Sequence, residues 1–509
     1  MNRTYEKEIE SVCDYSLPDY LGDVKKILTV TATAIPSGKF ASNGEVNFSG
    51  VVSYDILYVD SEDKLTALTL SSDYDVAVPV CEDEYIDSID EARVSSVAVR
   101  LTGPRKMTAK AIVANNVNLL LEDNFKYVGD AFKEGCVAET LSKVIKVEKT
   151  VFASSAEREY AEEAERLDGV TADEIEILAS SGSVRISESE VGKDGVVVRG
   201  EIIITSIVRT TEQPPFAIKK IIPFEETINF EGISPDMKVS VDGYLTSVTA
   251  GVSEDAEGSA ITVNAISELY CIASENKDVS VMTDAYIKNR DSAAKYEDVE
   301  YSTIVCASTT ESKISAEVKR EDIGCENARD ILKLTAEVKN LEKNITQSGF
   351  CLCGDAVFCA AAGEVAENGT VSHLPIKFSA PFSLNVNCNT AMPSTAELDC
   401  IVTPIDNEIV MDSEKLTVSC MLKIRYRVTN TDTVKRICEC NAVGDKEYKT
   451  SLSSIVVYYP SEHESLFEIA KKFHTTGSKI AHDNELSEQT ISTSGDPVSL
   501  FGVKKLIIR

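Results

Sequence analysis

Histidine is scarce in this chain, so few residues are suited to acid–base or metal chemistry near neutral pH. There are four histidines among 509 residues; His373 stands apart, whereas His463, His474 and His482 fall close together near the C-terminus. Three imidazoles are the ligand set of one kind of catalytic zinc site. Histidines exposed at helix ends are the commoner arrangement, and we favour that interpretation. We therefore predict no metal site in this group.

Cysteine spacing is the second pattern that could bind a metal. Cys351 and Cys353 stand two residues apart, as do Cys438 and Cys440, so in a strand each pair would share one face. Zinc sites usually combine such a pair with a second pair of cysteines or histidines, and neither pair has one nearby. Other cysteines, such as Cys271, lie in apolar runs and resemble small hydrophobic residues. We expect the cysteines to be reduced thiols that pack in the core.

No pattern of catalytic residues stands out in the sequence. It contains no nucleophile elbow, phosphate-binding loop or dinucleotide fingerprint. Paired carboxylates such as Glu162 and Glu163 are common, but 83 acidic residues against 51 basic ones make them typical of a solvated surface. The sequence therefore predicts a protein that is not an enzyme and needs no cofactor. An unrecognised hydrolase that uses one of these carboxylates is the least favoured alternative.

The charge of the chain limits its partners. A net charge of −32 is repelled by nucleic acid phosphates and by anionic lipid, so we expect neither as a partner. The acidic surface serves solubility or, alternatively, faces a basic patch of another protein. The N-terminal residues 1–8 are polar, and no apolar run approaches the ~18 residues of a membrane span. We expect no membrane insertion and a cytoplasmic protein.

Three glycines mark an internal repeat. Gly50, Gly200 and Gly354 each close an alternating stretch that begins at a turn, which gives a repeat of about 150 residues. Similar short segments recur with the same spacing on both sides of these glycines. Before the glycine they lie at residues 23–28, 172–178 and 328–334, and after it at residues 72–76, 222–228 and 380–384. Ordered landmarks that recur three times indicate a triplicated module.

Each copy has the pattern of a β-rich module. Val198, Ile202 and Ile204 alternate with Arg199 and Glu201, which is typical of a strand with one apolar face. Short strands separated by turn-forming residues favour antiparallel β-sandwiches. Short helices are expected between strands, in the charged stretch 155–166 and as a single turn near residues 19–23. The sequence predicts a mainly β protein of three repeated sandwich-like modules, at residues 1–139, 140–294 and 295–452.

The C-terminal residues 453–509 follow a different pattern. After a short apolar strand at 456–459, Leu466, Ile469, Ala470 and Phe473 form one helical stripe that Glu464 or Ser465 could cap. A second short helix is expected at 478–484 and a closing strand at 502–508. The order strand, helix, helix, strand predicts a small α+β domain.

Three segments of this domain resemble a LysM domain. They are residues 463–473, which read His-Glu-Ser-Leu-Phe-Glu-Ile-Ala-Lys-Lys-Phe, the Asn-Glu-Leu of 484–486, and the closing Gly-Val-Lys-Lys-Leu-Ile of 502–507. His463 and Glu464 stand where the family usually has Gly-Asp, the usual terminal proline is absent, and residues 493–496 lengthen the second loop. LysM domains that bind N-acetylglucosamine polymers hold the sugar between the two loops, so these departures weigh against sugar binding.

The repeated part resembles the SPOCS domain of clostridial spore-forming bacteria. The resemblance rests on Leu17-Pro18 followed by residues 26–28, Lys-Ile-Leu, and on Gly50-Val51 followed by residues 56–59, Ile-Leu-Tyr-Val. Copies two and three resemble it less closely. SPOCS repeats followed by a LysM domain are the arrangement of SipL-like spore-coat morphogenetic proteins. In that family the LysM domain binds the ATPase that polymerises on the forespore surface, and the complex organises coat assembly.

The resemblance implies a non-catalytic adaptor located in the mother cell, at the forespore surface or in the spore coat. Its expected partner is the coat ATPase, and the β modules are expected to self-associate or to bind further coat proteins. We expect the apolar stripe to be core and Phe467, beside it, to be exposed. The candidate contact residues of the two loops and first helix are His463, Glu464, Ser465, Leu466, Phe467, Glu485, Leu486 and Ser487. The alternative is a carbohydrate-binding protein that recognises peptidoglycan or another, chitin-like polymer of N-acetylglucosamine.

Overall fold

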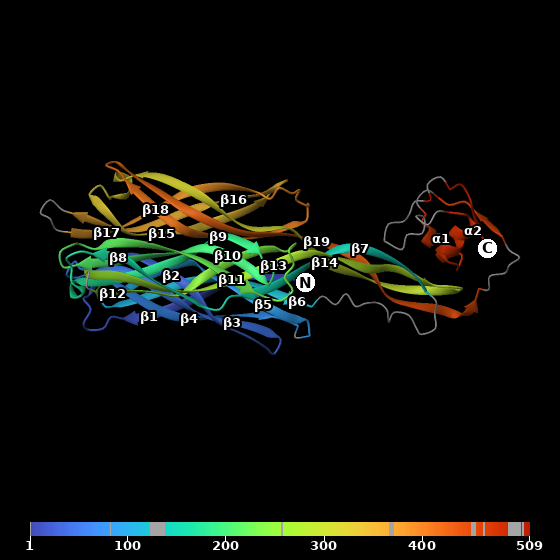
Figure 1. Ribbon diagram of the computed structural model, residues 1–509, viewed down its shortest axis with the longest axis horizontal. Coiled ribbons are helices and arrows are strands. Elements are labelled where there is room, and N and C mark those ends of the chain that lie inside the picture. Colours follow the sequence, from blue (N-terminus) through green and yellow to red (C-terminus); the bar gives the residue numbers. More distant parts are fainter. Residues whose placement is uncertain are drawn as a thin grey trace. The chain divides into compact units, whose positions relative to one another are not determined.

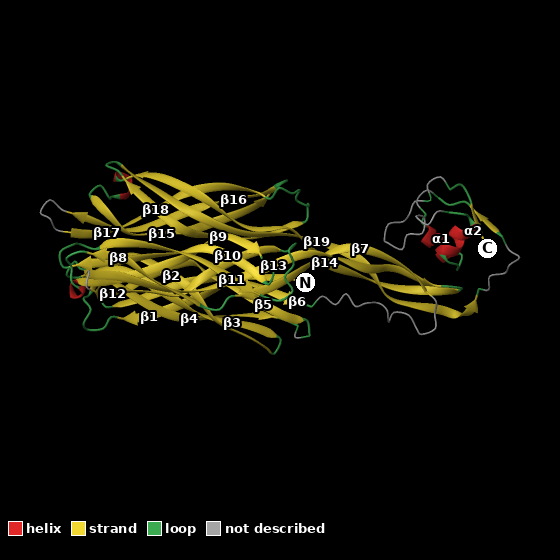
Figure 2. Cartoon of the chain, in the orientation of Figure 1, coloured by secondary structure: helices red, strands yellow, loops and turns green. Residues whose placement is uncertain are grey.

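The computed structural model describes residues 2–81, 83–122, 138–255, 258–365, 371–448, 455–461, 464–486, 500 and 503–509. The protein is mainly β, as predicted, and the helices that it describes are short (Figure 2). Two compact units are present, each built from three segments. Unit 1 contains Met1–Glu122, Thr150–Glu275 and Val305–Thr429, and unit 2 contains Asp123–Lys149, Asn276–Ile304 and Asn430–Arg509. Each unit draws on several of the segments expected from the sequence, so the four-part domain division stays a prediction.

The strands fall into three consecutive groups along the chain (Figure 1), which we call copies 1, 2 and 3. Copy 1 contains β1 Asn2–Ser16, β2 Val24–Ser42, β3 Glu45–Asp60, β4 Leu65–Pro79, β5 Tyr85–Gly103 and β6 Lys106–Leu121. Copy 2 contains β7 Ala138–Ser154, β8 Arg158–Leu167, β9 Ile175–Val191, β10 Gly195–Thr210, β11 Phe216–Asn229, β12 Lys238–Asp255 and β13 Gly258–Ile287. Copy 3 contains β14 Arg290–Lys319, β15 Ala328–Ile345, β16 Gly349–Val365, β17 Val371–Asn387, β18 Ala396–Met411 and β19 Lys415–Glu447.

The three copies share one strand arrangement. In each, three consecutive strands form a meander, in the orders β2-β3-β4, β9-β10-β11 and β15-β16-β17. The remaining strands form a second sheet, in the orders β1-β6-β5, β7-β13-β12 with β8 also paired to β13, and β14-β19-β18. One buried core joins both sheets of a copy, as Tyr54 of β3 and Ala109 of β6 do in copy 1. Equivalent cores join the two sheets of copy 2 and of copy 3.

The repeated glycines have one structural role. Gly50 lies opposite Tyr74 in the strand register, Gly200 opposite Phe224, and Gly354 opposite Phe382. The aromatic ring covers the glycine each time; a Cβ on Gly354 would lie 3.2 Å from the Phe382 ring. Because the ring occupies the place of a side chain, the position needs glycine. The upstream turn, the glycine and the downstream aromatic residue are therefore one conserved arrangement within the three copies.

The expected helix at residues 155–166 is wrong. Residues 158–167 form β8, which pairs antiparallel with Ser259–Ser267 of β13. Tyr160 and Ala164 pack against the core of copy 2, while Arg166 on the exposed side forms an ion pair with Asp255 at 2.7 Å. Pairing with a long neighbouring strand therefore decides the structure of this charged segment, whose composition alone favours a helix.

All three copies contribute to a buried junction in unit 1. Its apolar part includes Leu57 and Leu65 from copy 1, Ile207 from copy 2, and Leu332 from copy 3. Its polar part contains one carboxylate from each copy. These are Glu91 of β5, which pairs with Arg425 of β19, Asp242 of β12, which pairs with Lys423 of β19, and Asp399 of β18, which accepts a hydrogen bond from Asn116 Nδ2 at 3.2 Å. Buried charges need such partners, so the junction fixes the copies to one another.

The two Cys-x-Cys pairs lie in strands, in different surroundings. Cys351 and Cys353 share one face of β16, with their Sγ atoms 3.6 Å apart and beside the Ser383 hydroxyl, and both are half-buried rather than core residues. In β19, Cys440 is buried and Cys438 is half-buried. In the part of the chain that the structure describes, no three cysteine, histidine or acidic side chains are grouped as metal ligands. None of the helices described there is long and apolar enough to cross a bilayer.

Candidate partner-binding site

The C-terminal residues form a small module in unit 2. Its elements are β20 Val456–Tyr458, α1 Leu466–Lys472, α2 Gly477–Asp483 and β21 Leu506–Ile508 (Figure 1). β20 and β21 pair antiparallel, with Val457 opposite Ile507. Two helices and a two-stranded sheet therefore make up the described part of the module.

The apolar stripe of α1 is the core of this module, as expected. Leu466, Ile469 and Ala470 are buried against Ile480 of α2 and Leu506 of β21. Leu466 is only 5% exposed, so its role is to hold the helix in place. We therefore remove Leu466 from the candidate contact residues, because a partner cannot reach it without opening the core.

Ser465 caps the first helix. Its hydroxyl accepts a hydrogen bond from the Glu468 N–H at 3.1 Å, and the Glu468 carboxylate accepts one from the Ser465 N–H at 2.8 Å. This reciprocal pair is a capping box, which satisfies donors that a helix start otherwise leaves free. Ser465 is buried by this arrangement and is likewise a structural residue.

Glu464 closes the loop that leads into α1. The Tyr458 hydroxyl donates to its carboxylate at 2.6 Å, and the Ser461 N–H donates to the other oxygen at 3.3 Å. The Tyr458 hydrogen bond is the main cause that lowers the pKa of Glu464. The Lys472 ammonium lies 4.8 Å from the centre of the Tyr458 ring and adds positive charge. Glu464 is therefore ionised and oriented, with part of its side chain on the surface.

One side of α1 is already occupied within unit 2. The Phe467 ring packs edge-on against Tyr286 of β13 at 5.1 Å, and the Tyr286 hydroxyl donates to the Thr475 carbonyl at 2.7 Å. Lys471 pairs with Asp284 at 2.7 Å. Phe467 is therefore half-buried against the chain itself, and the expectation that it is exposed is wrong. The distance along the sequence between β13 and α1 hides this contact.

Two of the three neighbouring histidines are described, and they differ. His474 stacks on Tyr448 with ring centres 4.1 Å apart, and its Nδ1 lies 3.2 Å from the Arg290 carbonyl. His482 is exposed at the end of α2. The expectation of an exposed helix-end histidine is met by His482, while His474 joins the packing of the module on the β13–β14 hairpin.

The loops expected to bind a partner are only partly within the described structure. His463 and Ser487 lie outside the described residues. Glu485 is exposed, with a left-handed backbone (φ 54°), and Leu486 is partly buried against the module core. Of the expected contact residues, Glu464 and Glu485 have surface available for a partner.

An exposed apolar segment at and beside β20 was not among the expected contact residues. Ile455, Val456, Val457 and Tyr459 expose 63%, 41%, 50% and 71% of their surface. Among the described residues β20 pairs with β21 alone, so within that part of the chain its other edge has no strand partner. The available signal was the run of five apolar or aromatic residues at 455–459, directly before Pro460, since a strand with one buried face should alternate.

The repeated β module has a recognised relative. A family model described as "SipL, SPOCS domain" matches residues 175–253, from the start of β9 almost to the end of β12. The match supports classing this β module as a SPOCS domain. It thereby supports the sequence-based assignment to the SPOCS-domain sporulation proteins. The match lies in copy 2, although copy 1 resembles the domain more closely by its motifs. The comparisons with curated proteins and with solved structures give no match.

Proposed function

We propose that this protein is a non-catalytic adaptor in spore-coat morphogenesis. Its C-terminal module, a LysM-like domain by sequence resemblance, docks onto the coat ATPase at the forespore surface, and the β modules support assembly. The observation that carries this proposal is the SPOCS-domain match in copy 2, because that family is one of sporulation proteins. The protein then acts in the mother-cell cytoplasm, at the forespore surface or in the coat.

We place the docking surface on β20 and the loop that follows it. The apolar side chains of Val457 and Tyr459 are exposed, and the strand edge beside them is unpaired among the described residues. A partner segment can add to such an edge through backbone hydrogen bonds, with exposed side chains supplying specificity. Glu464 adds an ionised carboxylate to the same surface, since its Tyr458 partner belongs to β20.

The side of α1 that carries Phe467 is a poorer docking surface. A partner that used this side would have to displace the contacts of Tyr286 and Asp284 with the helix. Aromatic packing of this kind contributes about 0.5–1.5 kcal/mol beyond the area that it buries. β20 needs no such displacement, which is the reason for preferring it.

The test compares two exposed tyrosines. Tyr459→Ala removes an apolar side chain from the proposed surface, and Tyr20→Ala removes a similarly exposed one (84%) from unit 1. With the purified coat ATPase immobilised, Tyr459→Ala should weaken binding about tenfold, as expected for an aromatic contact at an interface. Tyr20→Ala should bind like the unaltered protein. Equal affinities for both variants would contradict the proposed surface.

A separate experiment tests the alternative that the protein binds carbohydrate. Sedimentation of the full chain with insoluble peptidoglycan measures it directly. The adaptor proposal expects the protein to stay in the supernatant. Retention on peptidoglycan together with no affinity for the ATPase would replace the proposal by the alternative.

A further inference from the structure

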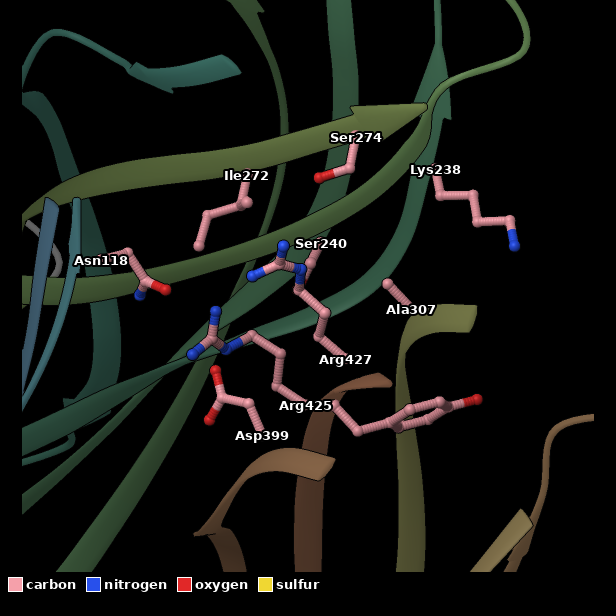
Figure 3. A pocket seen from close by; sticks show the side chains of 10 residues that line it. Asn118, Lys238, Ser240, Ile272, Ser274, Ala307, Asp399, Arg425 and Arg427 are labelled. Carbon is pink, nitrogen blue, oxygen red and sulfur yellow. The ribbon is translucent and has the colours of Figure 1, made fainter. Parts of the chain in front are cut away.

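The junction of unit 1 uses its buried cations within the chain. Arg425 pairs with Glu91, and Lys423 pairs with Asp242. Figure 3 shows the Arg425 guanidinium next to the Asp399 carboxylate, at a hollow of about 20 Å³ that has room for about one water. These cations are therefore not available to a partner.

The C-terminal module, by contrast, carries cations on its surface. Residues 500–509 contain Lys504, Lys505 and Arg509 and no Asp or Glu, in a chain with a net charge of −32. All three side chains are exposed, and within the described part of the chain none of them forms an ion pair. In that part of the chain, their charge is left for a partner.

Side-chain alternation places two of these cations on the outer face of β21. Leu506 and Ile508 are 0% and 5% exposed, so they point into the core of the module. Because successive side chains of a strand point to opposite sides, Lys505, Ile507 and Arg509 lie on the outer face. The two cations therefore lie on either side of Ile507.

The neighbouring strand adds apolar side chains to this face. Val457 lies opposite Ile507 in the register of β20 and β21 and is 50% exposed. Tyr459, two residues further on and 71% exposed, continues the same side of the chain. The outer face of the sheet thus has an apolar centre, formed by these three residues, with Lys505 and Arg509 at its rim.

We propose that the partner segment that docks on this outer face is acidic, with Asp or Glu among its apolar residues. The inference rests on the docking function proposed above and specifies the chemistry of the partner. The stems of Lys505 and Arg509 can lie along the apolar centre while their charged ends meet carboxylates at the rim. Complementary charges at a rim chiefly raise the association rate and select the partner.

The charge of the rest of the chain favours a short protein segment over a larger polyanion. At physiological salt, exposed charges interact over about 8–10 Å, so a segment on this face interacts mainly with the local cations. Nucleic acid or an anionic membrane extends further and is repelled by the net charge of −32. An acidic segment of a protein is therefore the fitting partner.

The test measures association of the full chain with the purified, immobilised coat ATPase in about 0.05 M and about 0.5 M sodium chloride. The association rate of the unaltered chain should fall at least about tenfold in the higher salt. At low salt, Lys505→Glu combined with Arg509→Glu should slow association about tenfold and leave the dissociation rate within about twofold. Lys505→Gln removes one exposed charge and should slow association about threefold, which keeps the test valid if the double variant fails to fold.

The matched control combines Lys106→Glu with Lys193→Glu, which replaces two exposed lysines of unit 1 and changes the net charge equally. Its association rate should stay within about twofold of that of the unaltered chain. Equal slowing by both double variants, or a loss confined to the dissociation rate, would overturn the inference and leave the docking function in place. No binding of the unaltered chain at either salt concentration would overturn the docking function, and the inference with it.

Discussion

Replacing Arg425 by Met tests whether the buried junction holds the copies together. The Arg425 side chain is 8% exposed and its partner Glu91 is 2% exposed, so the pair is shielded from water. The change keeps the apolar stem but removes the cation that faces the Glu91 carboxylate, which still accepts a hydrogen bond from Asn118 Nδ2 at 3.2 Å. Breaking a buried pair by removing one partner costs about 3–5 kcal/mol. We expect a loss of that size in the free energy of unfolding.

The loss should depend on pH. Burial raises the pKa of Glu91 above its ordinary value of 4.5, and Arg425 is the main influence that lowers it. Without Arg425 the pKa in the folded state rises further. A carboxyl group whose folded pKa is raised stabilises the fold below its unfolded pKa, and this contribution is lost as the pH rises through the folded pKa. The destabilisation by Arg425→Met should therefore be larger at pH 8 than at pH 5.

The assay is urea unfolding followed by circular dichroism and by tyrosine fluorescence, since the chain has no tryptophan. Adding Glu91→Gln to Arg425→Met removes the buried carboxylate that has lost its cation. The double variant should therefore recover part of the lost free energy of unfolding at pH 8. Arg166→Met is the control, because Arg166 forms ion pairs with Glu163 and Asp255 on the surface and should cost less than about 1 kcal/mol. Equal midpoints for Arg425→Met and Arg166→Met, or no recovery on adding Glu91→Gln, would refute the reasoning.

Three further predictions concern stability and thiol reactivity. Burial and, to a smaller extent, the neighbouring Glu91 carboxylate raise the pKa of Asp90 from 3.8 to about 7. The protonated Asp90 side chain therefore stabilises the fold below pH 3.8, and this stabilisation is lost as the pH rises through 7. Asp90→Asn should raise the free energy of unfolding at pH 8 by about 4 kcal/mol and flatten its pH dependence in urea titrations; an unaltered profile would contradict this. Gly200→Ala would place a Cβ 2.7 Å from an aromatic ring and against a backbone carbonyl, and should cost about 2 kcal/mol by thermal unfolding, whereas Gly103→Ala, in open space, should not. At pH 8 a thiol reagent should modify exposed Cys81 first and Cys271, whose pKa burial raises to about 12, only on unfolding, as mass spectrometry of the labelled peptides will show.

The threefold repeat could be predicted from the sequence because the residues that mark it contact residues on neighbouring strands. Gly50, Gly200 and Gly354 recur because a facing aromatic ring needs the space, and both partners lie on neighbouring strands. The helical stripe of α1 was accessible for a similar reason, since burial of one helix face imposes its own spacing.

Long-range contacts set the limit of the sequence argument. Glu91 and Arg425 are 334 residues apart, and each has the composition of an ordinary surface charge in a strand. Phe467 was expected to be exposed because its ring falls beside the core stripe, but Tyr286 of a distant strand covers it. Local composition also misassigned residues 158–167, where pairing with β13 imposes a strand. In each case a residue far away in the sequence decides whether the segment is buried, paired or in a strand, and local composition does not reveal that residue.

The most direct test of the adaptor account is recovery of the coat ATPase from sporulating cells with the tagged full chain and with a chain that lacks residues 456–509. The account predicts that the full chain retains the ATPase and that the shortened chain loses it, while circular dichroism shows that the shortened chain keeps its β structure. Equal recovery by the two chains would contradict the account, because docking would then belong to the β modules.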